Sequence, residues 1–202
     1  MMEKIHFKAG QIELEGILQL NDSENGVVLA HPHPLYGGNM FDFVLESAEN
    51  AFLKKGYTTL KFNFRGVGKS QGRFDNGRGE QEDLLAAVAH LRELGLTKID
   101  LAGYSFGTWI ISRINTEEIG IKDLFYISPP MGLMDFSGVP AMKALKLVTT
   151  GSMDEYAPPA TLRKVLDECE STACLEIIEG ADHFYGGYHY ELEKIIHAHI
   201  GK

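Results

Sequence analysis

The sequence predicts a single α/β domain of 202 residues, in which a mostly parallel, eight-stranded sheet carries helices on both faces. Short apolar runs of strand length alternate along the chain with longer segments of helical periodicity. The chain is long enough for one well-buried domain, residues 1–202, and too short for two. No repeat, low-complexity tract or linker divides it.

The strands are predicted from short apolar runs bounded by glycine, proline or polar residues. Residues 2–20 are expected to form a β-hairpin, because apolar and polar residues alternate from Ile12 to Glu15. The continuous apolar run at 27–30 is typical of a central strand covered on both faces. The remaining strands are expected at 58–64, 97–102, 124–127, 145–149 and 175–178.

Helices are predicted between these strands, where apolar residues recur at a spacing of three or four. One begins near Phe41 and stops at Gly56. Helix 80–94 has acidic residues in its first turn, where the helix dipole favours them. Another follows Ser105, a fourth opens at Pro158 with Cys169 expected to face inward, and a last helix closes the chain.

The run Gly103-Tyr104-Ser105-Phe106-Gly107 lies between a predicted strand and a predicted helix. A serine with a glycine two residues away on each side, at such a turn, has the pattern of a nucleophile elbow. Glycine is needed because a Cβ at either position would strike the neighbouring strand or helix. The following helix directs its partly positive N-terminus at the serine. Ser105 is therefore the candidate nucleophile.

The segment Gly68–Gly72 matches the same pattern around Ser70. A polar, glycine-rich stretch without helical periodicity follows it, so no helix would hold a nucleophile there. The triplet Gly68-Lys69-Ser70 also resembles the end of a phosphate-binding loop, but that loop requires glycine at position 63, which is asparagine. We expect neither a nucleophile nor a nucleotide site at Ser70.

A catalytic serine needs a general base, and a carboxylate that orients the base. In a parallel sheet, ligands bind beyond the carboxyl ends of the strands, so the residues that follow strands are the candidates. Asp154 and His183 follow the last two predicted strands. The order Ser105, Asp154, His183 is the serine–acid–histidine order of this architecture. The alternatives are Glu155 or Asp182 as the acid and His189 as the base.

Two further blocks follow predicted strands, HPHPLYGGNM at 31–40 and NFRGVGKS at 63–70. The second resembles the Arg-Gly-x-Gly-x-Ser turn common in α/β-hydrolases, which explains the second match at Ser70. The first resembles a small, lidless bacterial branch of that superfamily with an HPHPLYGG loop, related to dienelactone hydrolases and carboxylesterases. The resemblance covers nearly the whole chain. It implies the fold, the nucleophile, the acid and the base, but little about the substrate.

Acyl transfer through a serine needs N–H donors for the substrate oxyanion. One is expected to be the backbone N–H of Phe106, directly after the nucleophile. The second is expected in the loop after residue 30, where Pro32 and Pro34 lack an N–H, which leaves His33, Leu35 or Tyr36. Aligning the loop with the family's turn permits either His33 or Leu35, with a slight preference for Leu35.

His31 and His33 are spaced so that both rings could lie on one face, as metal ligands do. A zinc site usually needs further ligands, and none follows in the same loops. We therefore expect no metal and no cofactor, and the two histidines are expected to shape the loop.

The connection from Ser128 to Ala144, rich in proline, glycine and methionine, is too short for a helical lid. The site is therefore expected to be open and to accept a small or exposed acyl group. Its expected flanking residues are Leu35, Tyr36, Met131, Met134 and Tyr185.

The net charge of −9 argues against nucleic acid or an anionic membrane as the partner, because both require a basic surface. No apolar run has the length to span a bilayer, and the first residues lack a signal core. We expect a soluble, cytoplasmic protein with a small-molecule substrate. Cys169 and Cys174 fit a reducing compartment in which both are structural.

The function predicted best is therefore a serine hydrolase of the carboxylesterase kind, acting on a carboxylic ester or thioester. A peptidase or amidase would use the same three residues and differs only in the substrates it accepts. A non-catalytic scaffold with the same fold ranks last, because such proteins usually lose part of the triad and this chain retains a candidate for each position.

Overall fold

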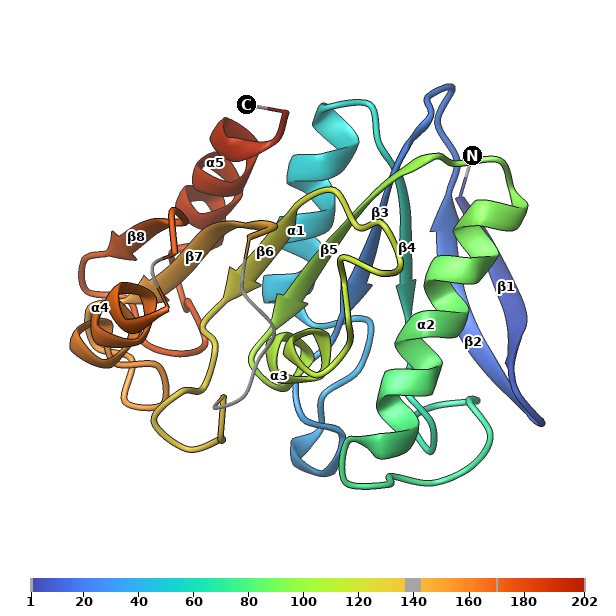
Figure 1. Ribbon diagram of the computed structural model, residues 1–202, viewed down its shortest axis with the longest axis horizontal. Coiled ribbons are helices and arrows are strands. Elements are labelled where there is room, and N and C mark those ends of the chain that lie inside the picture. The colour runs from blue at the N-terminus through green and yellow to red at the C-terminus, as the bar shows by residue number, and fades with distance from the viewer. Residues whose placement is uncertain (1, 137–142, 170, 202) are drawn as a thin grey trace.

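The computed structural model describes residues 2–136, 143–169 and 171–201. The described residues form one sheet of eight strands, and Figure 1 shows that this sheet is twisted. The strands are β1 (Met2–Ala9), β2 (Ile12–Gln19), β3 (Asn25–Ala30), β4 (Thr58–Phe62), β5 (Lys98–Tyr104), β6 (Leu124–Ile127), β7 (Leu145–Gly151) and β8 (Cys174–Ile178). The helices are η1 (Pro34–Tyr36, a 3-10 turn), α1 (Phe43–Lys54), α2 (Arg78–Glu93), α3 (Phe106–Ser112), α4 (Pro159–Glu168) and α5 (His189–His199).

The strands lie in the order β1-β2-β4-β3-β5-β6-β7-β8. The pairs β1–β2 and β2–β4 are antiparallel, and every other neighbouring pair is parallel. The predicted fold class is confirmed. Because the strands from β4 to β8 run the same way, their carboxyl ends lie at one edge of the sheet, where the loops carrying Ser105, Asp154 and His183 also begin.

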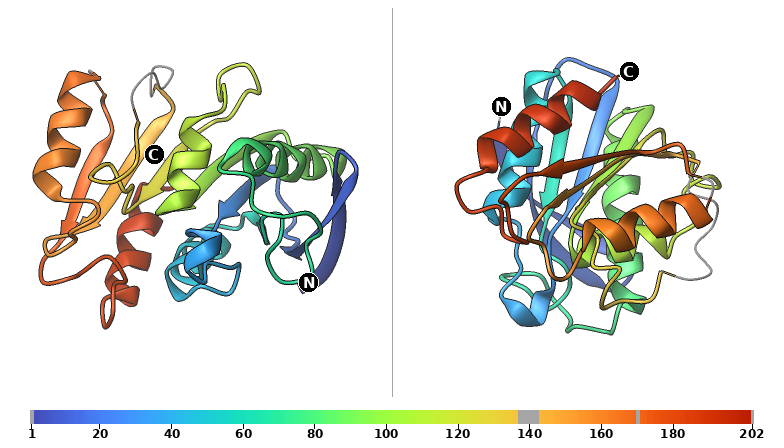
Figure 2. Two further views of the ribbon diagram at one scale, coloured as in Figure 1. Left: turned by 90° about the horizontal axis from the view of Figure 1, so that it is seen from below. Right: turned by 90° about the vertical axis from the view of Figure 1, so that its left-hand side faces the viewer.

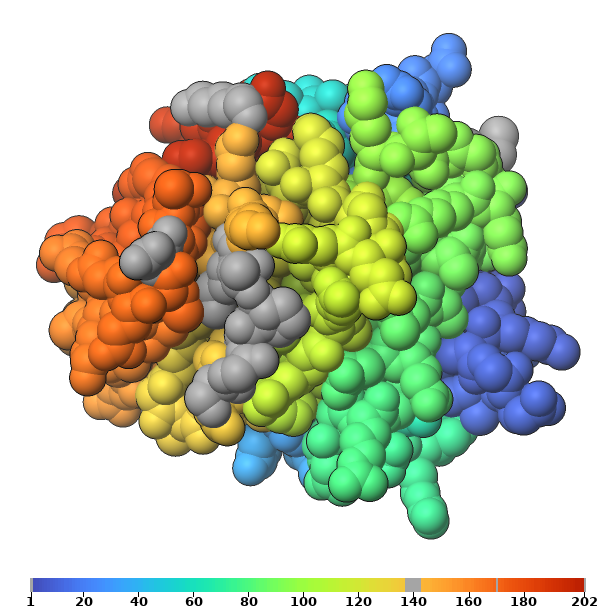
Figure 3. Space-filling view, viewed as in Figure 1, coloured from blue at the N-terminus to red at the C-terminus, as the bar shows by residue number. Residues whose placement is uncertain are grey.

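Helices α2, α3 and α4 cover one face of the sheet, and α1 and α5 cover the other (Figure 2). Within β3, Val28 belongs to the core under α2, while Val27 and Leu29 belong to the core under α1. This alternation between two buried faces explains why the strand reads as an unbroken apolar run. Figure 3 shows the first face, where the green side chains of α2 and the orange ones of α4 hide the sheet.

The connection between β6 and β7 is described at 128–136 and 143–144, where it forms bends and turns. Residues 137–142, part of the segment expected to be too short for a lid, lie outside the described residues. One prediction about α4 is wrong. The helix ends at Glu168, so Cys169 lies at its C-cap and is exposed instead of facing inward. Cys174 is also exposed.

No helix in the described part of the chain combines the length and the apolar character that crossing a bilayer requires.

Candidate active site

Ser105 lies at the sharp turn between β5 and α3, with φ of 51° and ψ of −117°. A positive φ is rare for a residue with a side chain and costs about 1–3 kcal/mol, so the surrounding structure must hold it. The Ser105 N–H donates to the Ile127 carbonyl at 2.9 Å, and its carbonyl accepts from the Thr108 hydroxyl at 2.6 Å. The turn is thus fixed to the next strand and to its own helix.

The glycines that flank Ser105 are required by close backbone contacts. A Cβ on Gly103 would lie 2.6 Å from the Thr108 nitrogen, and one on Gly107 would lie 2.2 Å from the Ala30 carbonyl oxygen. Both distances are shorter than carbon can approach backbone atoms. The spacing of the five-residue pattern therefore follows from the packing of α3 against β5 and β3.

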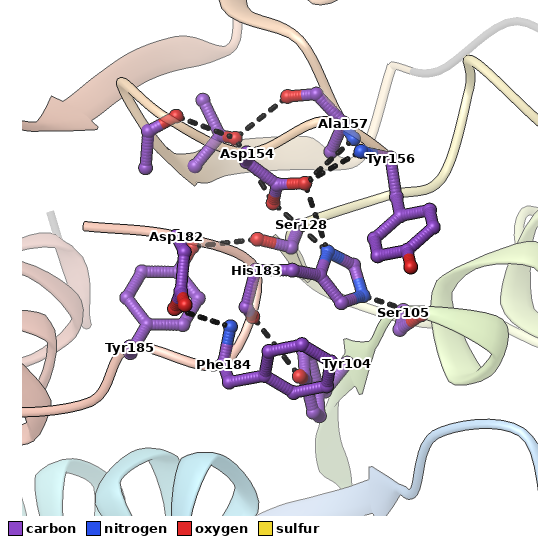
Figure 4. A network of polar contacts seen from close by, with 12 residues as sticks. Tyr104, Ser105, Ser128, Asp154, Tyr156, Ala157, Asp182, His183, Phe184 and Tyr185 are labelled. Atoms are coloured by element: carbon purple, nitrogen blue, oxygen red, sulfur yellow. Dashed lines mark hydrogen bonds and ion pairs between the residues drawn. The ribbon is translucent and has the colours of Figure 1, made fainter. Parts of the chain in front are cut away.

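Ser105, His183 and Asp154 lie within hydrogen-bond distance in a row (Figure 4). His183 Nε2 is 3.0 Å from the Ser105 Oγ, and its Nδ1 is 2.9 and 3.0 Å from the two Asp154 carboxylate oxygens. An ionised carboxylate only accepts, so Nδ1–H donates to Asp154. Nε2 is then free to accept the proton of the Ser105 hydroxyl.

The Asp154 carboxylate is buried and well supplied with donors. Its Oδ1 accepts from the N–H groups of Tyr156 and Ala157 at 2.9 and 2.8 Å, and the Ser128 hydroxyl also bonds to it. Burial alone would raise the pKa of Asp154, but the hydrogen bond and charge of His183 and the donors around it outweigh burial and lower that pKa. The group is therefore held as a carboxylate.

The loops after β7 and β8 are in close backbone contact at the edge of the sheet. A Cβ on Gly151 would lie 2.1 Å from the Ala181 carbonyl oxygen, and the Met153 N–H donates to that same oxygen at 2.9 Å. From the central strand, the Tyr104 hydroxyl donates to the His183 carbonyl at 3.0 Å. These contacts place the histidine between the serine and the carboxylate.

The alternative partners lie elsewhere. Glu155 is exposed, and Asp182 turns its Oδ1 to the Phe184 N–H at 3.0 Å, away from the neighbouring imidazole. His189 is the first residue of α5 and makes a ring contact with Phe43 on α1. Asp154, and not Asp182, therefore lies against the His183 ring, and His189 lies against α1.

The Ser70 hydroxyl is held by two backbone groups. Its hydroxyl donates to the Asn63 carbonyl at 2.7 Å and accepts from the Glu15 N–H at 3.0 Å. The side chain is buried, and α2 begins only at Arg78. The serine of the second pattern therefore ties the turn after β4 to β2.

His31 and His33 also have local roles in the HPHPLYGG loop. The buried His31 ring uses both nitrogens, with Nδ1 donating to the Pro32 carbonyl at 2.6 Å and Nε2 accepting from the Phe64 N–H at 3.0 Å. Burial lowers the pKa of His31 to about 4, so the ring stays neutral. His33 packs its ring against Phe106, with centroids 4.7 Å apart.

The N–H groups of the loop are largely engaged. The Leu35 N–H donates to the His33 Nδ1 at 3.2 Å, and Tyr36 and Gly38 donate to the His33 carbonyl. Across the described residues, no such bond engages the His33 N–H itself. On the other side, the Phe106 N–H is in the first turn of α3 and lacks an intrahelical acceptor.

A cavity of about 630 Å³ opens above Ser105 and His183. Tyr36 and Met134 line it as expected, but the other three expected residues do not, and one of them, Leu35, is exposed outside the lining. Tyr185 is completely buried, with its hydroxyl 2.9 Å from that of Ser128, and Met131 packs against the core under α3. Apolar residues that form much of the lining are Tyr36, Phe106, Leu133, Met134, Tyr156 and Phe184.

Sequence reasoning missed several of these lining residues. Tyr156 and Phe184 lie within two residues of Asp154 and His183 in the sequence, and this closeness could have indicated that they line the site. Asp42 also lines the cavity, and it caps α1 by accepting from the Val44 N–H at 2.8 Å. Nothing in the helical periodicity indicates that this cap faces the site.

No family model matches the chain. The chain is 32% identical to an uncharacterized protein of Rickettsia prowazekii, over 98% of this chain and 89% of that protein. It is similar in structure to an α/β serine hydrolase homologue from Coxiella burnetii, with a TM-score of 0.92 and 30% identity over 98% of this chain and 97% of that one. It is also similar to an α/β serine hydrolase without a lid from Xanthomonas campestris, with a TM-score of 0.91 and 29% identity over 98% and 93%.

Proposed function

The chain belongs to the α/β serine hydrolase family, and on that premise we propose that it hydrolyses a carboxylic ester or thioester through an acyl-enzyme on Ser105. One observation carries the proposal. The Ser105 Oγ lies 3.0 Å from the His183 Nε2, while Nδ1 of the same ring is held by the buried Asp154 carboxylate. A hydroxyl so placed can pass its proton to the ring as it attacks a carbonyl carbon.

The proposed reaction has two halves. In the first, the Ser105 oxygen bonds to the substrate carbonyl carbon and its proton moves to His183 Nε2, which then gives that proton to the departing alcohol or thiol. In the second, water gives a proton to Nε2 and attacks the acyl carbon, and the serine leaves with the proton restored. Asp154 remains ionised throughout and stabilises the transient imidazolium.

The oxyanion formed in each half requires two donors. The Phe106 N–H is one, because it has no acceptor in α3. For the second we propose the His33 N–H over that of Leu35, which already donates to the His33 ring. Phe106 and His33 both line the cavity beside Ser105, so the two N–H donors could reach the oxyanion from different sides.

The cavity favours a small, uncharged acyl group. Among the described residues of its lining, Asp42 is the sole carboxylate, and no lysine or arginine occurs. Tyr36, Leu133 and Phe184 are 88%, 70% and 63% exposed, so the apolar walls form an open rim. Such a rim offers little enclosure for a long chain.

The test is labelling with a fluorophosphonate probe, followed by turnover of a p-nitrophenyl ester series. We expect labelling and hydrolysis in the wild type and in Ser70→Ala, the matched control from the second pattern, and neither in Ser105→Ala. Turnover should fall by about 10⁶-fold in Ser105→Ala. Full activity in Ser105→Ala would overturn the nucleophile, and a sharp optimum at long acyl chains would overturn the substrate size. Anilide substrates run in parallel separate an esterase from an amidase.

A further inference from the structure

Cys174, Glu176 and His199 form a cluster away from the cavity, where β8 lies against the end of α5. Cys174 and Glu176 are two residues apart on β8, so they project from the same face of the strand. His199 comes from the last turn of α5. We propose that these three side chains bind a divalent transition-metal ion, with Zn²⁺ the preferred one.

The three ligand atoms are spaced much as the ligands of one metal ion are. The Cys174 thiol donates to the Glu176 Oε1 at 3.5 Å, and the His199 Nε2 is 3.6 Å from that same oxygen. An N–H···O bond is about 2.7–3.2 Å, so the second contact is too long for one. A tetrahedral zinc with bonds of about 2.0–2.3 Å separates its ligand atoms by roughly 3.3–3.5 Å. The three ligand atoms lie within 4.8 Å of one another, so a small closure suffices.

The His199 ring is already oriented as a ligand. Its Nδ1 donates to the Ile195 carbonyl one turn earlier in α5, at 2.9 Å. Because a carbonyl oxygen only accepts, that bond requires a proton on Nδ1, and in the neutral ring Nε2 is then the nitrogen that can bind a metal ion. A backbone carbonyl that holds the second nitrogen is the usual support of a metal-bound histidine.

The donor set selects the class of ion. A thiolate and an imidazole favour Zn²⁺ or Co²⁺ over Mg²⁺ and Ca²⁺, which prefer oxygen ligands alone. Three protein ligands leave a fourth position for water, and the 39% exposure of the Glu176 side chain gives solvent access to it. The bound ion would join the edge strand β8 to the C-terminal helix.

The proposed metal site is separate from the proposed catalytic residues. Cys174 begins β8, whereas His183 follows the carboxyl end of the same strand. Metal binding can therefore be measured by spectroscopy and by thermal stability, independently of hydrolysis. The failure of either proposal leaves the other intact.

The experiment titrates tag-free, chelator-treated full-length protein with Co²⁺ and records thiolate-to-cobalt charge-transfer absorption. We expect one equivalent to bind, Zn²⁺ to displace it, and the melting temperature to rise as the ion saturates the folded protein. Cys174→Ser should remove the charge-transfer band, and Glu176→Gln and His199→Gln should weaken binding roughly tenfold or more.

The matched control is Cys169→Ser, which removes the other cysteine of the chain, at the end of α4. That variant should bind Co²⁺ as the wild type does. Absence of the charge-transfer band in the wild type, or its persistence in Cys174→Ser, overturns the proposal. Equal binding by wild type and by both carboxamide variants also overturns it.

Discussion

The Asp154 carboxylate contacts the His183 Nδ1 through both oxygens, at 2.9 and 3.0 Å, although 28 residues of chain separate the two. The carboxylate next in sequence to His183, Asp182, bonds instead to the Phe184 N–H. The position of a side chain on the fold, and not its nearness in sequence, decides which acid orients the ring. This distinction can be tested with one pair of variants.

Asp154→Asn should lower kcat by about 10⁴-fold with little change in KM. The amide cannot stabilise an imidazolium, and its NH₂ group favours the tautomer with the proton on Nε2, where the base must be free. Steady-state kinetics on a neutral p-nitrophenyl ester measures the effect. Asp182→Asn is the matched control and should keep kcat within roughly twofold of wild type. Equal losses in the two variants would contradict the assignment of the acid.

Ser70→Ala should destabilise the fold while leaving acyl transfer intact. The substitution removes a buried hydroxyl and leaves the Glu15 N–H without its acceptor, at an expected cost of about 1–3 kcal/mol. Urea unfolding measures the free energy of unfolding, and probe labelling measures the nucleophile. A folded Ser70→Ala protein that fails to label would show that this turn takes part in the chemistry.

Gly107→Ala should disrupt the elbow. Its Cβ would lie 2.2 Å from the Ala30 carbonyl oxygen, so α3 or β3 must shift, and the Phe106 N–H would move with the helix. We expect a loss of several kcal/mol in stability, on the order of 2–4 kcal/mol, as overpacking of a rigid contact produces, together with a large loss of turnover. Gly186→Ala is the control, because no atom lies within 4 Å of the added carbon. Similar melting temperatures for both variants would refute the argument.

Asp100→Asn should stabilise the protein in a pH-dependent way. Burial raises the pKa of Asp100 to about 6 in the folded state, and within the described residues its Oδ2 has no hydrogen-bond partner. Because the folded pKa is raised, the carboxyl does not lower the free energy of unfolding below about pH 4, where it is mostly protonated in the folded and the unfolded states alike. It becomes unfavourable as the pH rises from there through 6, because the group must then ionise while buried.

The stability of Asp100→Asn relative to wild type should therefore grow from near zero at pH 4 to about 2–3 kcal/mol at pH 7. Urea denaturation across that range measures the difference. The amide oxygen can still accept from the Asp123 N–H, which donates to the Asp100 Oδ1 at 3.2 Å. A difference that stays constant with pH would exclude titration of this carboxyl.

Asp42→Asn should change the charge preference of the cavity. Asparagine caps a helix as well as aspartate does, so α1 should remain intact. Loss of the negative charge should raise kcat/KM for an ester with an anionic acyl group by roughly fivefold relative to a neutral one, the effect of about 1 kcal/mol of repulsion. Comparison of succinate half-ester and butyrate substrates measures the ratio. An unchanged ratio would place the bound acyl group away from Asp42.

The sequence predicts the strands and the residues that follow them well, because both depend on local periodicity. Ser105, Asp154 and His183 could be selected for this reason, since each follows a strand whose carboxyl end lies at the same edge. The lining of the cavity could not be predicted in the same way. Tyr185 lies two residues after His183, yet φ of 54° turns it beneath the loop, where its hydroxyl reaches Ser128 on a distant segment.

Other details also depend on long-range or end effects. Periodicity places Cys169 on the inner face of α4, but the helix stops one residue earlier, so the face no longer continues. The choice between His33 and Leu35 depends on a bond from one backbone N–H to a side chain two residues away. No spacing rule in the sequence indicates such a bond.

Ser105 and His183, between which the proton is proposed to move, follow strands that differ in their resistance to local unfolding. Ser105 follows β5, which has a strand on each side, whereas His183 follows β8, which within the described residues lies at the edge of the sheet and pairs with β7. An edge strand opens by local fluctuations at a lower free energy than a central one. Mild heat or dilute urea should therefore abolish hydrolysis reversibly, because local opening of β8 displaces His183 from Ser105. Circular dichroism should still report a folded chain under these conditions.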